Sequence, residues 1–172
     1  ISKWESHPIR DIIMLVNTAL GIPPAVTSLH VFIVHGHNDR LKLELKNYIQ
    51  NVLRLPEPTI LHEQPNLGRT IIEKFEDYAA ASALVFVLLT PDDIAALASE
   101  PDEQKRRSRQ NVIFELGYFL GILGRESGRV ILLYSGPLEL PSDLSGVTYI
   151  DVSEGITSAG ENIRREIAHV IA

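Results

Sequence analysis

The feature that most constrains the fold is an unbroken apolar segment in the middle of the chain, Leu84 to Leu89. A strand with one face in water alternates polar and apolar residues, and this segment does not alternate. A continuous apolar strand needs cover on both faces, as it has in a parallel sheet with helices on each side. We therefore predict that residues 83–89 form the central strand of an α/β domain.

Strand-like and helix-like segments alternate on both sides of that strand. We predict the other strands at residues 29–34, 59–61, 130–134 and 148–152. We predict helices at residues 40–53, 70–82 and 109–123, and a last helix marked by Ile163 and Ile167. Helical crossovers between parallel strands are right-handed, and the simplest result is a doubly wound, flavodoxin-like sheet of five parallel strands.

The segment after the central strand has the signals of a short helix. Thr90 is a capping residue, Pro91 suits the first helical position, and Asp92 and Asp93 place acids in the first turn. A polar, charged segment from Ser99 to Ser108 follows the predicted helix.

A chain of 172 residues suffices for one well-buried domain and an appendage. In residues 1–28, apolar side chains such as Ile9, Ile13 and Val16 recur at helical spacing, so we predict an amphipathic helix and a linker there. The main domain is predicted to span residues 29–172. Because the chain begins at Ile1 rather than Met, we expect it to be part of a longer protein.

Composition argues against several classes of function. The net charge of −6 argues against nucleic acid as a partner, and the absence of cysteine excludes disulfides and thiolate metal sites. His35 and His37 lack a clear third ligand, so we expect ordinary loop histidines and no metal site. No apolar run reaches the roughly 18 residues of a membrane-spanning helix, and no signal-peptide pattern is present, so we expect no membrane association and a cytoplasmic location.

A ligand is expected beyond the carboxyl ends of the strands, where the strand order reverses. The loop after the first strand supplies His35, Gly36, His37 and Asn38, which include donors, acceptors and a glycine that permits close approach. The loop after the central strand supplies Thr90 and Asp92. These side chains are therefore candidates for substrate binding.

Glu115 is the only carboxylate in the apolar helix predicted at residues 109–123. A carboxylate in such surroundings is costly unless it is paired, hydrogen-bonded or facing a pocket. Asn111 lies one turn earlier on the same side of the helix, so both side chains are expected to face the crevice. The alternative is a structural acid paired with a nearby arginine.

A basic cluster precedes that helix. Lys105, Arg106, Arg107 and Arg109 oppose the helix dipole instead of complementing it, which favours a nearby anion. The alternative is a solvated loop whose charges are balanced by the acids at residues 100–103.

Four motifs in order resemble the bacterial TIR-like domains, of the Toll/interleukin-1 receptor class. They are Val-Phe-Ile-Val-His-Gly-His at 31–37, Leu-His-Glu-Gln-Pro-Asn-Leu-Gly-Arg-Thr-Ile-Ile-Glu-Lys-Phe at 61–75, Val-Leu-Leu-Thr-Pro-Asp at 87–92 and Arg-Gln-Asn-Val-Ile-Phe-Glu-Leu-Gly at 109–117. Domains similar to these cleave NAD⁺ in anti-phage defence and are often fused to a sensor of a cyclic-nucleotide signal.

The resemblance implies a role for particular residues. The family's catalytic glutamate matches Glu115, and its second-strand loop matches residues 64–69, so Leu67, Gly68 and Arg69 are candidates for substrate binding. Related domains complete their site with a neighbour's loop, which implies self-association and a sensor domain outside this sequence. Many relatives have an aromatic residue or cysteine where this chain has Asn111.

A single carboxylate suits cleavage of the nicotinamide–ribose bond. Nicotinamide leaves as a neutral molecule, so no second carboxyl is needed as an acid, and Glu115 would stabilise the oxocarbenium charge. Arg69, Arg109 and the loop at 35–38 are candidates for the pyrophosphate. The acceptor is water or the adenine ring, and the sequence does not choose between them. We expect NAD⁺ as substrate and no other cofactor.

Two other functions stay open. The first is a non-catalytic TIR module that only binds partners, with Glu115 in a structural role. The second is a phosphoacceptor receiver domain, which the sequence disfavours because the central strand ends in Leu89-Thr90 without the acceptor aspartate.

Overall fold

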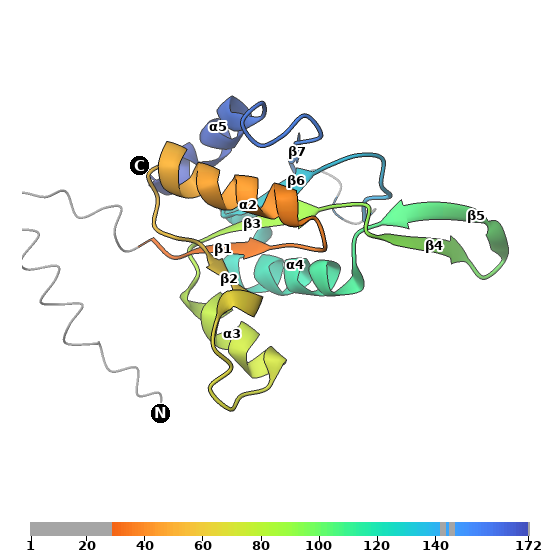
Figure 1. Cartoon of the computed structure of the whole chain (residues 1–172), viewed down its shortest axis with the longest axis horizontal. Coiled ribbons are helices and arrows are strands. Elements are labelled where there is room, and N and C mark those ends of the chain that lie inside the picture. The colour runs from red at the N-terminus through yellow and green to blue at the C-terminus, as the bar shows by residue number, and fades with distance from the viewer. Residues whose placement is uncertain (1–28, 142–143, 145–146, 172) are drawn as a thin grey trace, which may run out of the picture.

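The computed structural model describes residues 29–141, 144 and 147–171. Its core is a five-stranded, fully parallel sheet with the order β2-β1-β3-β6-β7 (Figure 1). The strands are β1 (Val31–Val34), β2 (Thr59–Ile60), β3 (Leu84–Leu89), β6 (Val130–Tyr134) and β7 (Tyr149–Asp151). This confirms the predicted flavodoxin-like, doubly wound sheet, with Leu84–Leu89 at its centre.

The N-terminal helix predicted within residues 1–28 lies outside the described residues. The proposed division of the chain at residue 28 therefore stays a prediction.

Helices cover both faces of the sheet (Figure 1). α2 (Asp39–Asn47) and α5 (Gly160–Ile171) pack on one face, and α3 (Ile71–Ala81) and α4 (Gln110–Leu123) pack on the other. A π-helical turn, Tyr48–Val52, extends α2 and so accounts for the single helix predicted at residues 40–53. All six side chains of β3 are buried, as the apolar pattern predicts.

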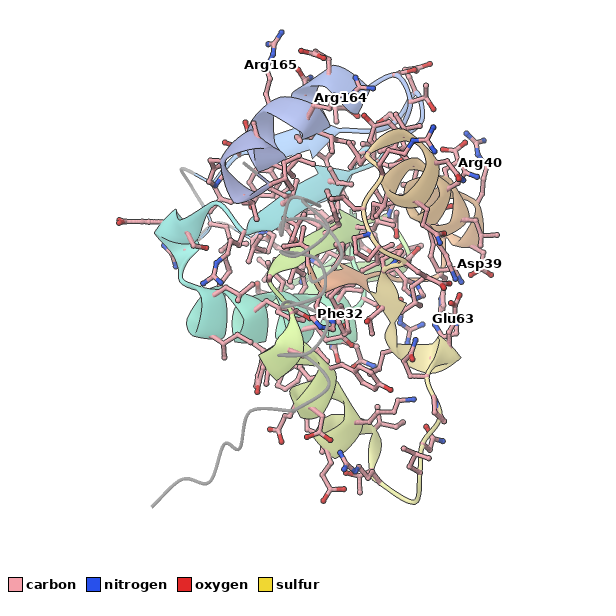
Figure 2. All side chains as sticks on the ribbon, turned by 90° about the vertical axis from the view of Figure 1, so that its left-hand side faces the viewer. Phe32, Asp39, Arg40, Glu63, Arg164 and Arg165 are labelled. Atoms are coloured by element: carbon pink, nitrogen blue, oxygen red, sulfur yellow. The ribbon has the colours of Figure 1, made fainter. Side chains whose placement is uncertain are left out.

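Aromatic contacts hold α3 and α4 against the sheet. The ring centroid of Phe32 in β1 lies 5.0 Å from that of Phe119 in α4 and 6.1 Å from that of Phe75 in α3. Figure 2 shows Phe32 among the inner side chains, while Arg40 and Arg165 project outward. Replacing such a phenylalanine with alanine costs about 3–5 kcal/mol, so this cluster fixes the helix that carries Glu115.

The segment after β3 differs from the prediction. β4 (Asp93–Leu97) and β5 (Glu100–Arg107) form an antiparallel hairpin that projects from the domain in Figure 1. The predicted helix beginning at Thr90 is therefore wrong, and most of the polar, charged segment at residues 99–108 forms β5. The Thr90 hydroxyl donates to Asp92 Oδ2 instead of capping a helix, and strand pairing overrides the local helix signals.

Within the part of the chain that the structure describes, none of the helices is both long enough and apolar enough to cross a membrane.

Candidate functional site

A cavity of about 480 Å³ opens beyond the carboxyl end of β1. Four parts of the chain line it: the end of β1 and its loop, the first part of the loop after β2, the beginning of α3, and the first turns of α4. The lining residues are Ile33, His35, Gly36, His37, Leu61, His62, Asn66, Ile71, Lys74, Arg109, Asn111, Val112 and Glu115.

The helical register of α4 aims Glu115 into this cavity. Val112, Leu116 and Phe119 are buried at spacings of four and three residues, so they form the stripe that packs on the sheet. Asn111 and Glu115 each precede one of these buried residues and are therefore rotated by about 100° from the stripe, at the cavity wall.

Glu115 is half-buried, and it has no hydrogen bond or salt bridge to any of the described residues. Burial raises the pKa of Glu115 to about 7, because loss of water disfavours the charged form and no cation compensates. The structural alternative required an arginine partner, and none pairs with Glu115 in the described part of the chain. An unpaired acid in a cavity is typical of a binding or catalytic site.

The other charged groups of the cavity are cationic. The guanidinium of Arg109 lies 3.0 and 3.1 Å from the two ring nitrogens of His37. Lys74 is only 5% exposed, and its Nζ donates to the Gln64 carbonyl at 2.8 Å and to Asn66 Oδ1 at 2.9 Å. Neither cation is paired with a carboxylate of the described residues. The cavity therefore suits an anionic ligand that also carries a positive centre for Glu115.

The structure brings together six of the residues that the sequence indicated. His35, Gly36, His37, Arg109 and Asn111 line the cavity together with Glu115.

Asn38 does not line the cavity. Its Oδ1 accepts from the backbone N–H of Leu41 at 3.0 Å and so caps α2.

Thr90 and Asp92 lie behind the loop after β1 instead of in the cavity. Asp92 Oδ2 accepts from the backbone N–H of His37 at 3.1 Å and from the Thr90 hydroxyl at 2.8 Å. A Cβ atom on Gly36 would overlap the same carboxylate oxygen. The two residues therefore support the shape of the loop that carries His35 and His37.

The loop after β2 divides between two cavities. Asn66 lines both the site and an adjoining cavity of about 360 Å³, whereas Leu67 and Arg69 line only the adjoining one. Arg69 pairs with Asp77 of α3, and Gly68 has a positive φ of 76° at the turn. The second half of this loop, which the family resemblance indicated for substrate binding, is thus not brought to the site in this chain.

Sequence reasoning did not single out Lys74 or His62. Lys74 shares the inward face of α3 with Phe75 and Ala79. The signal that could have identified Lys74 is therefore a cation at a helical position where an apolar residue is expected. His62 follows the second strand as His35 follows the first, which places both at the same edge of the sheet.

The basic cluster before α4 separates into two groups. Lys105 and Arg107 of β5 both contact the carboxylate of Glu139, so Glu139 balances them instead of the acids at residues 100–103. Only Arg109 turns to the cavity.

Among the described residues, no group of three His, Cys, Asp or Glu side chains is arranged to hold a metal ion.

Fold and site together define a doubly wound α/β domain with one unpaired acid in an otherwise basic crevice. The chain belongs to the family described as the CAP12/Pycsar effector protein TIR domain, whose model matches residues 30–154. The TIR fold is therefore established, in agreement with the motif resemblance.

Three curated proteins illustrate the relationship. The uncharacterised protein YuaY of Escherichia coli K12 is 43% identical over 150 residues, which cover 85% of this chain and 48% of YuaY. Protein tirC of Dictyostelium discoideum is 35% identical over 137 residues, or 74% of this chain and 66% of tirC. The Pycsar effector protein PaPycTIR of Pseudomonas aeruginosa is 29% identical over 139 residues, or 74% of this chain and 40% of PaPycTIR. The match thus spans between 40% and 66% of the length of these relatives.

Proposed function

We propose that this domain cleaves the bond between nicotinamide and ribose in NAD⁺. The observation that carries the proposal is Glu115, a half-buried acid without a protein partner among the described residues, in a cavity whose other charged groups are cations. NAD⁺ has the matching distribution of charge, a cationic pyridinium at one end and an anionic pyrophosphate further along.

The chemistry requires one carboxylate. The C1′–N bond breaks and its electron pair leaves with neutral nicotinamide, so the leaving group needs no proton. The ribose is left with oxocarbenium character, which the ionised carboxylate of Glu115 stabilises in a partly water-excluded cavity. The pyridinium itself favours ionisation of Glu115 on binding, because a nearby opposite charge lowers the pKa of an acid.

Arg109 is the best-placed group for the pyrophosphate. It immediately precedes α4, where the helix dipole also favours an anion. Arg109 and Glu115 are six residues apart, or roughly 9 Å along a helix axis, which a ribosyl phosphate can bridge. Lys74 adds a second positive charge on the α3 side of the cavity.

The relatives support a proposal about the biological setting. We infer an anti-phage effector, because the family is that of the CAP12/Pycsar effectors and PaPycTIR is itself called a Pycsar effector. Activation by self-association in the cytoplasm is part of the same proposal, and it rests on the motif resemblance. The relatives extend well beyond the matched region, so a sensor of the activating signal would lie outside the sequence described here.

A non-catalytic TIR interaction module is the second candidate. The hairpin favours it, because Ile94 and Leu97 are 60% and 57% exposed and present apolar surface to a partner protein. In that case Glu115 would have no chemical role.

The deciding experiment measures nicotinamide release from NAD⁺ by concentrated or artificially clustered protein. Glu115→Gln keeps the size of the side chain and removes its charge, so we expect a loss of at least about 100-fold. Glu126→Gln, at an exposed position outside the cavity, is the matched control and should retain activity. Equal and negligible release by clustered wild type and Glu115→Gln would refute the enzyme and leave the interaction module.

A further inference from the structure

Two histidines of the cavity form a hydrogen-bonded pair that the cleavage step does not use. His35 Nε2 lies 3.1 Å from His62 Nδ1, and the ring centroids are 5.0 Å apart at an interplanar angle of 71°. Both side chains line the cavity that contains Glu115. The pair joins the loop after β1 to the loop after β2, across 27 residues of sequence.

The position of the protons in this pair follows from one further contact. His35 Nδ1 lies 2.7 Å from the carbonyl oxygen of Gly36, and a carbonyl can only accept, so Nδ1 carries a proton. In neutral His35 the other nitrogen, Nε2, is therefore an acceptor. His62 Nδ1 must then be the donor, which leaves His62 Nε2 with a free lone pair.

The surroundings keep His35 neutral. Burial lowers the pKa of His35, and this exceeds the opposing effect of its hydrogen bond to Gly36. Two charged groups of α2 act on the ring in opposite directions, Lys42 lowering the pKa and Asp39 raising it, and these two are bonded to each other at 2.6 Å.

Glu63, the charged residue next to His62 in the sequence, is bonded to another side chain. Glu63 accepts a hydrogen bond from Lys46 at 2.8 Å, and Figure 2 shows Glu63 at the same edge of the molecule as Asp39. Neither carboxylate forms a hydrogen bond to either histidine ring. None of the described residues forms a hydrogen bond with His62 Nε2, and His62 lines the cavity, so this nitrogen can accept a proton from a molecule bound there.

We propose that His62, held in this tautomer by His35, is the base that takes the proton from the water that hydrolyses NAD⁺. This inference rests on the proposed function. The water oxygen bonds to C1′ of the ribose while the C1′–N bond breaks with its electron pair going to nicotinamide, and one water proton passes to His62 Nε2. The products are ADP-ribose, nicotinamide and a proton that His62 later releases to solvent.

The hydrogen bond between His62 and His35 stabilises the protonated form of His62. Once His62 is protonated, its Nδ1–H donates to His35 Nε2 from a charged ring, and such a bond is stronger than the neutral one. The arrangement therefore favours the state that the reaction produces. Permanent positive charge for the phosphates is supplied separately by Arg109 and Lys74.

The test compares two acceptors for the same ribosyl group. Water must lose a proton, whereas a pyridine such as 3-acetylpyridine attacks through a nitrogen that has none to lose. We expect His62→Gln to lower hydrolysis by at least about 100-fold, the lower end of what a general base contributes. The exchange of nicotinamide for 3-acetylpyridine should change by less than about 3-fold, and added imidazole should restore part of the hydrolysis.

A matched control is His30→Gln, an exposed histidine outside this cavity, which should change neither reaction. Because His62 is itself exposed, its variant should fold normally, which thermal unfolding checks. Unchanged hydrolysis by His62→Gln overturns the base role. An equal loss of hydrolysis and exchange with a raised KM also overturns it, since His62 would then bind substrate.

The two proposals fail in different ways. If wild type releases nicotinamide and Glu115→Gln does not, but His62→Gln hydrolyses NAD⁺ normally, only the base role is refuted. If wild type and Glu115→Gln are equally inactive when clustered, both proposals are refuted.

Discussion

The site cavity and the β4–β5 hairpin differ in whether their charged side chains are paired, although the chain runs directly from the hairpin into the cavity wall. In the hairpin, Lys105 and Arg107 converge on Glu139, so a carboxylate satisfies the cations within the protein. In the cavity, Glu115, Arg109 and Lys74 have no opposite charge as partner among the described residues.

That difference distinguishes a structural role from a binding role. An exposed ion pair contributes little to stability, and it presents little net charge to a ligand. Unpaired charges in a cavity are costly to the protein alone, and a ligand of complementary charge recovers that cost. Arg107 and Arg109 are only two residues apart, yet Arg107 is paired with a carboxylate and Arg109 lies unpaired in the cavity among the described residues. Basic residues that are clustered in the sequence therefore need not form one binding surface.

The largest effect is expected where the cavity's shape is fixed. Gly36→Ala places a Cβ atom against Asp92 Oδ2 and disturbs the bond from the His37 N–H. Because a shift of about 1 Å in a site can cost 100-fold in rate, NAD⁺ cleavage should fall by about that factor. Nicotinamide release by purified variants measures this effect.

Gly121→Ala is the matched control for that substitution. A Cβ atom there meets nothing within 4 Å, and in the middle of α4 alanine should stabilise the protein by about 0.5–1 kcal/mol. Full activity of Gly36→Ala would show that the Asp92 support does not shape the site.

The second prediction divides the basic cluster. Under the proposed function, Arg109→Ala removes a charged donor to the pyrophosphate, and such a bond contributes about 1.5–3 kcal/mol, so the KM for NAD⁺ should rise at least about 10-fold. Arg107→Ala removes a cation that is already paired with Glu139 and should change KM less than about 2-fold. Initial rates of nicotinamide release give both values, and equal effects would mean that the two arginines form one anion-binding surface.

The pattern of apolar residues predicted most of the fold, because the burial of apolar side chains determines which segments pack in the core. The apolar run at β3 was sufficient to predict the sheet's centre, and the spacing of Asn111 and Glu115 predicted the side of α4 that faces the cavity. Glu115 could be singled out for the same reason, as the one acid beside an apolar stripe.

The hairpin and the second-strand loop could not be predicted this way. Residues 90–93 carry local helix signals, but Asp93–Leu97 becomes a strand through pairing with β5, whose end is anchored by Glu139 more than 30 residues away. The direction of the loop depends on Lys74 binding Asn66 and on Arg69 pairing with Asp77. Such contacts form between side chains that no local pattern relates.

The third prediction concerns pH and stability. Folding raises the pKa of Glu115 from 4.5 to about 7, so between these values the folded protein holds a proton that the unfolded chain has lost. Stability from this group is complete below about pH 4.5 and is lost as the pH rises to about 7. Glu115→Gln should therefore gain stability relative to wild type across this range, with no further gain above it.

Denaturant unfolding at pH 5, 6, 7 and 8 measures that difference. Glu126 is exposed, so Glu126→Gln is the control. Its free energy of unfolding relative to wild type should not rise between pH 5 and pH 7 as that of Glu115→Gln does. A gap between Glu115→Gln and wild type that stays constant with pH would mean that Glu115 is as well solvated in the folded state as in the unfolded chain.

The smallest effect is expected in the hairpin. Glu139→Gln leaves Lys105 and Arg107 without their carboxylate, but both are substantially exposed, so the loss of stability should be small and should shrink in high salt. Nicotinamide release should be unchanged, because the cavity does not include Glu139. A large loss of cleavage at full stability would instead place the hairpin in the active assembly, and paired charge in this domain would then no longer indicate a purely structural role.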